Sequence, residues 1–218
     1  MRKLMILPVI AALILGCNSN NAEEAKTGEA KKSGEAVGEM MAINTESSEL
    51  HWRGVKPTGE HYGTVGISGG EVAVEEGKIT GGTININLNN IICEDLEGDM
   101  NARLVGHLKS EDFFYVEEYP RAKFEIVSAE KFTGEASEDI APTHEITGNL
   151  TMRGETKSIS FPAMVKIEDG MVMAKTNEFA IDRTLWGVNF KSKKVFAELK
   201  DDFINDMINL KFDVTFDN

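Results

Sequence analysis

The residue types that most often carry catalysis are scattered along this chain of 218 residues. The four histidines are His51, His61, His107 and His144, and no two stand at the i, i+2 or i, i+4 spacing of metal ligands. The sequence contains no cluster of His and Cys, no glycine-rich phosphate loop and no G-x-S-x-G nucleophile motif. Neighbouring acids on a strand point to opposite faces, so the many acidic pairs are expected to be solvated. These patterns predict a protein that is not an enzyme and has no cofactor or metal site.

The densest group of polar and aromatic side chains is the segment HLKSEDFFYVEEYPRAKFEI, residues 107–126. A histidine, an arginine and several acids lie next to aromatic residues there, which is a composition that a catalytic loop can have. The same composition suits the rim of a β-barrel, where a helix ends and an alternating strand begins after Pro120. The residue types alone leave both interpretations open.

The first 17 residues, MRKLMILPVIAALILGC, have the order of a secretory signal. Arg2 and Lys3 precede an apolar run that is too short to cross a bilayer as a mature helix. The run ends in a sequence similar to a bacterial lipobox, so we expect a signal peptide over residues 1–16 and acyl chains such as palmitate on Cys17. An ordinary signal peptide followed by a coincidental cysteine is the alternative.

The segment that follows Cys17 is small, polar and charged, without an apolar period. Such a composition does not offset the entropy of ordering, so residues 17–41 are expected to form a flexible tether and residues 42–218 the folded domain. We therefore expect a lipid-anchored protein of the bacterial cell envelope. Because Asn18 rather than Asp follows the cysteine, the outer membrane, facing the periplasm, is the expected location.

Composition limits the classes of partner. The formal net charge is −13, and binding to nucleic acid needs a basic face, so no nucleic-acid partner is expected. If Cys17 carries lipid, Cys93 has no disulfide partner in the chain and is expected to be a buried small hydrophobe. A reactive thiol at Cys93 is the alternative.

Alternation of apolar and polar residues with a period of two is the strongest structural signal. In residues 81–90, GGTININLNN, Ile84, Ile86 and Leu88 share one face and the asparagines share the other. Similar segments follow to the C-terminus, separated by expected turns at Gly69–Gly70, Gly81–Gly82, Gly154 and Gly170. Antiparallel strands with one wet face fit this pattern, and we expect an all-β barrel of about eight strands. The segments 99–110 and 195–203 are expected to add one or two short helices.

Three methionines, Met164, Met171 and Met173, cluster in sequence near Phe161. Methionine fills irregular space, so this group suits a cavity for a flexible apolar guest. Ordinary core packing is the alternative explanation of the same residues.

Three ordered motifs resemble the YceI-like family. The segment LVGHLKSEDFFYVEEYPRAKFEI is similar to a motif in which a helix leads to an H-L-x-S-x-D-F-F turn, a Tyr-Pro pair and a strand. The segment GNLTMRGETKSISFP is similar to a strand pair with the pattern G-x-L-T-x-x-G-x-T-K, and FAIDRTLWGV is similar to an I-D-R-x-x-W-G segment. Together these motifs extend over most of the chain from about residue 45 onward.

The resemblance implies a lipocalin-like barrel that holds a polyisoprenoid or a similar amphiphile, such as a quinone-like or fatty-acyl lipid. The opening segment is then interpreted as rim and hinge. The family leaves the ligand, the delivery partner and the oligomeric state open, with a dimer as one alternative. The rival hypotheses are a quinone-linked redox accessory or enzyme, in which Cys93 or a histidine would react, and a structural envelope lipoprotein with a filled barrel.

Candidate site residues follow from the inward faces of the strands and from the family motifs. His107 and Arg183 are expected at the polar rim, and Asp182 and Arg183 are expected to form an ion pair with each other rather than contact a ligand head. The residues expected to contact the ligand are Ile84, Ile86, Leu88, Leu104, Leu108, Phe113, Phe114, Phe124, Ile126, Leu150, Met152, Phe161, Met164 and Trp186.

Overall fold

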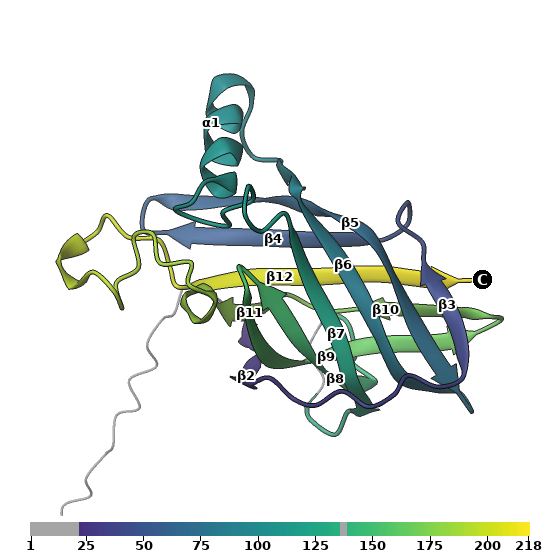
Figure 1. The fold of residues 1–218 in the computed structure, drawn as a ribbon. Helices are drawn as coiled ribbons and strands as arrows, with labels where there is room; N and C mark the ends of the chain where they lie inside the picture. Colours follow the sequence, from purple (N-terminus) through teal and green to yellow (C-terminus); the bar gives the residue numbers. More distant parts are fainter. Residues whose placement is uncertain (1–21, 136–138) are drawn as a thin grey trace, which may run out of the picture.

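Eight antiparallel strands close into a ring in the computed structural model, which describes residues 22–135 and 139–218 (Figure 1). The ring runs from each strand to the next in chain order and closes where the last strand pairs with both β4 and β10. The fold is therefore the antiparallel barrel that the alternation predicts. Its members are β4 (Glu49–Lys56), β5 (Gly59–Glu75), β6 (Lys78–Cys93), β7 (Arg121–Lys131), β8 (His144–Met152), β9 (Glu155–Glu168), β10 (Met171–Lys175) and β12 (Met207–Asp217).

The last strand shows why these residues form a barrel wall. Phe212, Val214 and Phe216 of β12 are buried, whereas Asp213 and Thr215 between them point away from the core. Each inward residue removes apolar surface from water, at about 25 cal/mol per Å². Closure of the ring leaves no open edge in the wall.

The two longest strands contain the glycine pairs expected to form turns, and that expectation is wrong for Gly69–Gly70 and Gly81–Gly82. Both pairs lie inside strands, with Gly70 paired to Ile84 and Gly82 paired to Val72. The φ angles of Gly69, Gly70 and Gly82 are between 147° and 158°. The ladder between β5 and β6 has a register shift between Ile67 and Gly69. Glycine here lets the wall bend rather than end. The expected turns at Gly154 and Gly170 are confirmed.

Residues 22–43 differ from the expected flexible tether. β1 (Glu23–Glu24) pairs with the chain at Phe179, β2 (Lys26–Glu29) pairs with β9, and β3 (Glu39–Ile43) pairs with β5 and β12. Between them, the Asn149 side chain holds the backbone of Lys31 with two hydrogen bonds of 2.8 and 2.7 Å. Backbone groups make most of these contacts. The amino-acid composition of this segment therefore did not predict that it would be ordered. The expected signal peptide and Cys17 lie outside the described residues.

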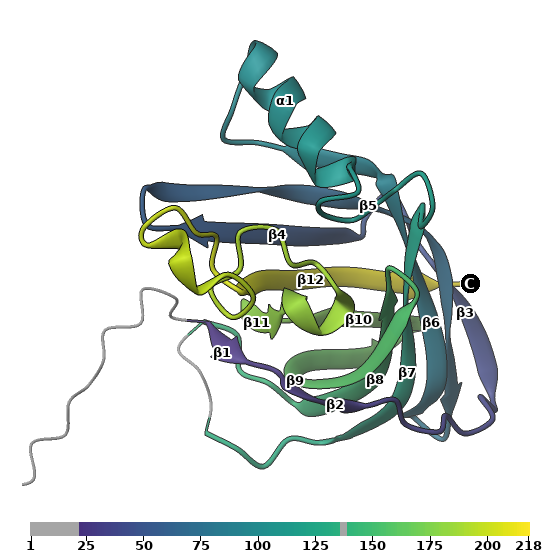
Figure 2. The same ribbon diagram turned by 60° about the vertical axis from the view of Figure 1, so that its left-hand side comes forward.

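One helix, α1 (Gly98–Lys109), projects from the barrel after β6, as expected for the segment 99–110 (Figure 2). The second expected helix, over residues 195–203, forms only a single turn, η2 (Ala197–Leu199). A helix of nine residues needs a buried face for stability, and Val195 and Phe196 are exposed there. Within residues 22–135 and 139–218, no helix has the length and apolar character needed to cross a membrane.

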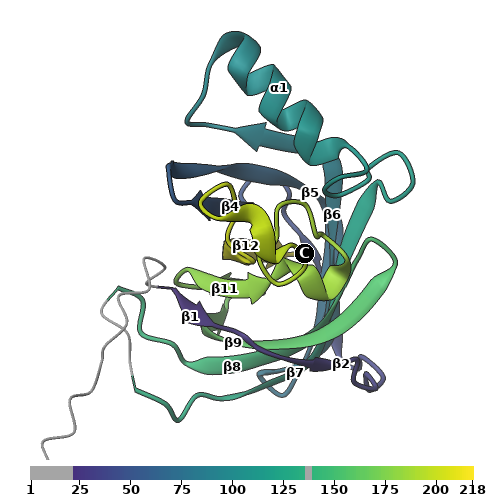
Figure 3. The same ribbon diagram turned by 90° about the vertical axis from the view of Figure 1, so that its left-hand side faces the viewer.

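A short strand and a turn complete the fold before the last strand. β11 (Phe179–Asp182) pairs with β12, and η1 (Arg183–Trp186) follows it directly. The chain then crosses one end of the barrel as an irregular segment, residues 187–206, and enters β12 (Figure 3). We call this stretch the end segment.

Candidate ligand-binding cavity

A cavity of about 430 Å³ occupies the half of the barrel nearest α1. Its volume falls in the usual range for small-molecule sites, about 300–1,000 Å³. Strands β4, β5, β6, β7, β8 and β12 and the short strand β11 supply its walls, and α1, the following turn and the end segment surround its mouth. The apolar side chains that line it are those of Leu50, Trp52, Val55, Val65, Ile86, Leu88, Ile91, Leu104, Leu108, Phe113, Phe114, Ala122, Leu150, Met152, Ile181, Val188, Phe190, Phe203, Ile204, Ile208 and Leu210.

The other half of the barrel is filled with aromatic rings. Phe161 stacks on Phe179 with ring centres 4.3 Å apart and planes 7° apart, and Phe212 lies nearly parallel to both. Phe124 lies against Phe161 at 5.7 Å and against Phe212 at 6.2 Å. We call these four residues the phenylalanine layer. It forms the part of the packed half next to the cavity, because Phe212 and Phe124 pair with the cavity-lining residues Leu50 and Leu150.

Most of the predicted site residues lie in the hollow half. The two expected rim residues, His107 and Arg183, also line the cavity. Their contact with a ligand stays a prediction. The predicted apolar residues that line the cavity are Ile86, Leu88, Leu104, Leu108, Phe113, Phe114, Leu150 and Met152.

Four predicted residues face inward but do not line the cavity: Ile84, Phe124, Ile126 and Phe161. Each is at most 7% exposed, and all belong to the packed half. Alternation identifies the inward face of a strand, but it does not show how far along the barrel the hollow extends. These four are therefore core residues, and their prediction as ligand contacts does not fit the geometry.

The prediction that Met164 contacts ligand is also corrected. On β9 the buried apolar residues are Ile159, Phe161, Ala163 and Val165, so Met164 has the opposite parity and points away from the barrel interior. Met171 and Met173 flank the fully buried Val172 in the same way. The methionine cluster is thus on the outer face of β9 and β10.

Trp186 is fully buried in η1 but does not border the cavity. Its Nε1–H donates a hydrogen bond of 2.9 Å to the carbonyl oxygen of Leu150. The ring thereby attaches η1 to β8 behind the cavity wall. Its role in the described structure is packing.

Several residues that line the cavity were not predicted from the sequence. Trp52 lies on the inward face of β4 with Leu50, and its Nε1–H is shared between the carbonyl oxygens of Thr64 (3.2 Å) and Ile92 (3.1 Å). The alternation of β4 was a sufficient signal for Trp52. Phe190 and Phe203 come from the end segment, where the backbone is irregular and no periodicity marks them.

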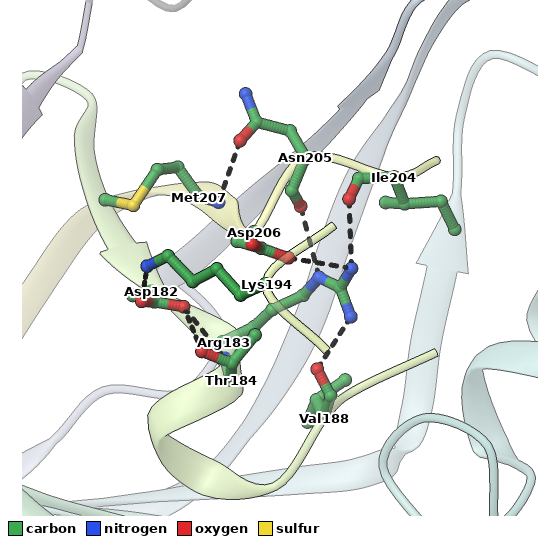
Figure 4. Close-up of polar contacts among 9 residues, drawn as sticks. All are labelled: Asp182, Arg183, Thr184, Val188, Lys194, Ile204, Asn205, Asp206 and Met207. Carbon is green, nitrogen blue, oxygen red and sulfur yellow. Dashed lines mark hydrogen bonds and ion pairs between the residues drawn. The ribbon is translucent and has the colours of Figure 1, made fainter. Parts of the chain in front are cut away.

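Arg183 fixes the end segment across the barrel (Figure 4). Its guanidinium is 1% exposed and donates to the carbonyl oxygens of Val188 (2.6 Å), Ile204 (3.1 Å) and Asn205 (3.1 Å). Asp206 lies 3.6 Å from the same group. Burial lowers the pKa of Arg183, and the neighbouring carboxylates oppose that shift. The arginine therefore binds both ends of the segment to the barrel.

The expected ion pair between Asp182 and Arg183 is wrong. Asp182 accepts hydrogen bonds from Lys194 and from the backbone and hydroxyl of Thr184 (Figure 4). Adjacent residues at the end of a strand point in different directions, which separates the two charges. Lys194 belongs to the end segment, so Asp182 provides a second attachment for it.

His107 lies at the mouth between aromatic rings. Its ring meets Phe113 edge-on at 5.1 Å and Phe190 at 4.6 Å, and its Nε2 lies 3.1 Å from Asp112. These contacts connect α1 to the turn after it and to the end segment. The part of the segment 107–126 from His107 to Pro120 therefore forms the rim of the barrel, and residues 121–126 begin the wall strand β7.

A chain of polar contacts reaches the mouth from the opposite side. Asp95 accepts hydrogen bonds from the backbone of Tyr62 (3.0 Å), Nδ1 of His61 (2.7 Å) and Sγ of Cys93 (3.3 Å). Nε2 of His61 lies 3.3 Å from Nζ of Lys56, and these two residues line the cavity. Burial opposes ionisation of Asp95, but the three hydrogen bonds outweigh it and lower its pKa. In the part of the chain that the structure describes, no group of three His, Cys, Asp or Glu residues is placed to hold a metal ion.

Comparison with known proteins gives consistent matches. The sequence model of the YceI-like domain matches residues 41–216. UPF0312 proteins from two strains of Pseudomonas putida, GB-1 and W619, are 29% and 28% identical to this chain over 159 residues, which is 73% of this chain and 73% of each relative.

Two solved structures share the fold. Burkholderia cenocepacia BcnA has a TM-score of 0.60 at 15% identity, and the match covers 79% of this chain and 98% of BcnA. A polyisoprenoid binding domain from Saccharophagus degradans has a TM-score of 0.58 at 12% identity, covering 81% of this chain and 97% of that domain. At these identities the two structures show a common architecture.

Proposed function

The chain belongs to the YceI-like domain family, and from that premise we propose that it binds a long apolar amphiphile inside its barrel and carries or buffers it. The proposal is for a binding protein that does not transform its guest. A polyisoprenoid is the first candidate class, since the similar fold from Saccharophagus degradans is a polyisoprenoid binding domain. Quinone-like and fatty-acyl lipids share the same kind of tail.

The observation that carries the proposal is the apolar cavity of about 430 Å³ above the phenylalanine layer. A polyisoprenoid tail offers nothing to hydrogen-bond, so walls of Ile, Leu, Val and Phe are sufficient to bind it. Its burial is worth about 0.8 kcal/mol per methylene-sized unit, before the cost of ordering the chain. The polar groups lie at the mouth, where a ligand head would be.

Lipid extraction and mass spectrometry of the purified protein test the proposal directly. We expect protein purified from bacterial membranes to carry an apolar amphiphile in near-stoichiometric amount. Alternatively, delipidated protein should take up added isoprenoid. Recovery of no lipid, together with no uptake, would contradict the proposal. A variant with a blocked cavity, described in the Discussion, is the matched control.

A redox accessory that uses Cys93 is the weaker alternative. The Cys93 side chain is buried, does not line the cavity and donates to Asp95. Burial and the neighbouring carboxylate raise the pKa of its thiol, which disfavours the reactive thiolate. We expect Cys93→Ser to leave lipid uptake unchanged. The hollow half of the barrel likewise favours a carrier over a structural lipoprotein with a filled barrel.

We also propose that the protein is anchored in the bacterial cell envelope through lipid on Cys17, in the outer membrane facing the periplasm. The support is the sequence of residues 1–18 alone. Metabolic labelling with an alkyne analogue of palmitate should mark the wild-type protein in the membrane fraction. Labelling of a Cys17→Ser variant to the same extent would contradict the anchor.

A further inference from the structure

The cavity mouth contains one cation that lacks an acidic partner. Arg183 is bound by carbonyl groups and Asp206, and Lys191 pairs with Asp202 at 2.5 Å. Among the charged side chains that line the cavity in residues 22–135 and 139–218, only Lys56 makes no ion pair.

Lys56 also breaks the pattern of its strand. On β4 it shares the inward face with Leu50 and Trp52, which line the apolar cavity. A charged residue on the inward face of a barrel strand costs desolvation energy unless it is compensated. Its position at the last residue of the strand places the ammonium at the mouth, where apolar wall and water meet.

The partners of Lys56 define its orientation. An ammonium can only donate, so Nε2 of His61, 3.3 Å away, must be the acceptor. The proton of the ring is then on Nδ1, which donates to Asp95 at 2.7 Å. Asp95 thus selects the tautomer of His61 that accepts from Lys56. One N–H of the ammonium is used by the ring, and its other two donors have no partner among the described residues.

We propose that Lys56 binds the anionic oxygen head, a carboxylate or a phosphate, of an amphiphile whose tail occupies the cavity. The inference rests on the proposed function and makes it more specific. His61 and Asp95 are positioning residues: the imidazole holds the ammonium at the mouth, and the carboxylate holds the imidazole. Both Lys56 and His61 border the cavity, so an oxygen head can reach the ammonium while the tail lies among the apolar residues.

The site favours an anion for two physical reasons. An anionic oxygen adds a direct charge–charge attraction to the hydrogen bond from the ammonium, which an alcohol oxygen does not supply. At the mouth the apolar wall lowers the effective dielectric constant, which strengthens the attraction relative to water. The protein as a whole carries a net charge of −13, so an anionic guest is favoured by this local site and not by the overall field.

Two matched pairs of ligands test the proposal: palmitate with hexadecanol, and farnesyl phosphate with farnesol. Each pair shares a tail and differs in the head. Displacement of an uncharged fluorescent probe, N-phenyl-1-naphthylamine, gives the affinity of each. We expect the anionic member to bind about tenfold more tightly than its alcohol in at least one pair, and the pair that shows it distinguishes a carboxylate from a phosphate.

The variants assign the preference to residues. Lys56→Met should bring the anion-to-alcohol affinity ratio close to one, because the anion loses far more affinity than the alcohol does. Lys78→Met, at the hairpin between β5 and β6, removes the same charge from an exposed position outside the cavity and should keep the ratio. His61→Leu should lower the ratio several-fold, whereas His61→Gln, which retains an acceptor, should recover part of it. A purely structural role of His61 would weaken both members of a pair equally.

The outcomes separate this inference from the proposed function. Equal affinity for anion and alcohol in the wild-type protein, or a ratio that Lys56→Met does not change, would overturn the role of Lys56 while the binding function stands. Binding of neither member of either pair would overturn the proposed function and this inference with it.

Discussion

Arg183 illustrates how one side chain can define the shape of a cavity. Its guanidinium donates hydrogen bonds to three backbone carbonyl groups, one at the start of the end segment and two near its finish. These bonds take the place of hydrogen bonds to water. Planar guanidinium presents several donors in a fixed geometry, which a lysine in the same place would not do. The aromatic residues of the end segment, Phe190 and Phe203, can border the cavity only because the segment is held across the barrel.

Replacement of Arg183 by Met should lower the free energy of unfolding by about 3–5 kcal/mol. The variant leaves three carbonyl groups without their donor and Asp206 without its cation. Urea denaturation measures the change. Arg103→Met removes an exposed arginine from α1 and should stay within about 0.5 kcal/mol of the wild type. Equal effects of the two substitutions would contradict the role of Arg183.

Asp182 should make stability depend on acid pH. Burial alone would raise its pKa, but hydrogen bonds from Lys194 and Thr184 outweigh burial and lower it. A carboxyl whose pKa is lower in the folded state stabilises the fold above its ordinary pKa, about 3.9, and loses that contribution as pH falls below it. Stability of the wild type should therefore decrease between about pH 5 and pH 3, partly through Asp182.

The Asp182→Asn variant tests this dependence. It should be less stable than wild type at pH 7, and the difference should shrink as pH falls through the acid range. Asp201→Asn removes the same charge from an exposed position in the end segment and should show no such convergence. Thermal unfolding at each pH measures both variants. A constant difference between Asp182→Asn and wild type from pH 7 to pH 3 would refute the assignment.

At the scale of elements, the bend in β5 and β6 depends on glycines that lie close to the backbone of the opposite strand. A Cβ on Gly70 would lie 2.3 Å from the carbonyl oxygen of Thr83, and one on Gly82 would lie 2.6 Å from that of Glu71. The two strands can therefore approach and curve only where these side chains are absent. This curvature lets two long strands take part in both the hollow and the packed half of the barrel.

Gly70→Ala should destabilise the protein by about 1–3 kcal/mol, because the φ angle of +156° and the close carbonyl oxygen both oppose a side chain. Gly28→Ala in β2 is the matched control, since a Cβ there meets no atom within 4 Å. Midpoints of urea denaturation compare the two. A larger loss in Gly28→Ala than in Gly70→Ala would show that the bend does not need glycine.

The sequence was sufficient for the elements that have a period and insufficient for those that lack one. Alternation predicted the barrel and the inward residues Leu88, Leu150 and Met152, because side-chain direction in a strand follows from parity. The helical spacing of apolar residues predicted α1. Phe161 and Met164 have opposite parity on one strand, so both cannot face inward. The sequence alone therefore argued against Met164 as a ligand contact. The position of the phenylalanine layer was not predictable, because it depends on which strands face each other at a given height.

The sequence did not predict the N-terminal strands and the end segment, for a different reason. Their order comes from contacts with distant residues, such as Asn149 with the backbone of Lys31 and Arg183 with that of Ile204. Local composition carries no record of a partner 118 residues away. A polar segment can therefore be ordered when its backbone completes another strand's hydrogen bonds.

At the scale of the whole molecule, the close-packed core and the proposed binding cavity occupy different halves of one barrel. The packed half resembles an ordinary protein core, whereas the hollow half leaves apolar walls without partners. Binding of a guest to the folded state alone would add stability of RT ln(1 + [L]/Kd), about 2.7 kcal/mol at a hundredfold excess over Kd. The two halves should accordingly respond differently to the same change of volume.

Ala122 and Ala163 provide a matched pair for this comparison. Both are buried on barrel strands, but only Ala122 borders the cavity. Ala122→Phe should fill the hollow, reduce lipid uptake at least tenfold and change stability by less than about 1.5 kcal/mol. Ala163→Phe should overpack the closed half and cost about 1–3 kcal/mol while uptake persists. Uptake assays and urea denaturation measure both, and unchanged uptake in Ala122→Phe would place the guest outside this cavity.

The phenylalanine layer also gives the barrel a floor at a fixed depth. A guest that enters from the mouth can descend only as far as the cavity-lining residues that pair with this layer, such as Leu50 beside Phe212 and Leu150 beside Phe124. Its affinity would then increase with each added carbon up to that depth and level off for longer tails, whose excess stays above the rim. The depth of the cavity would in this way determine the tail length that the barrel binds most tightly.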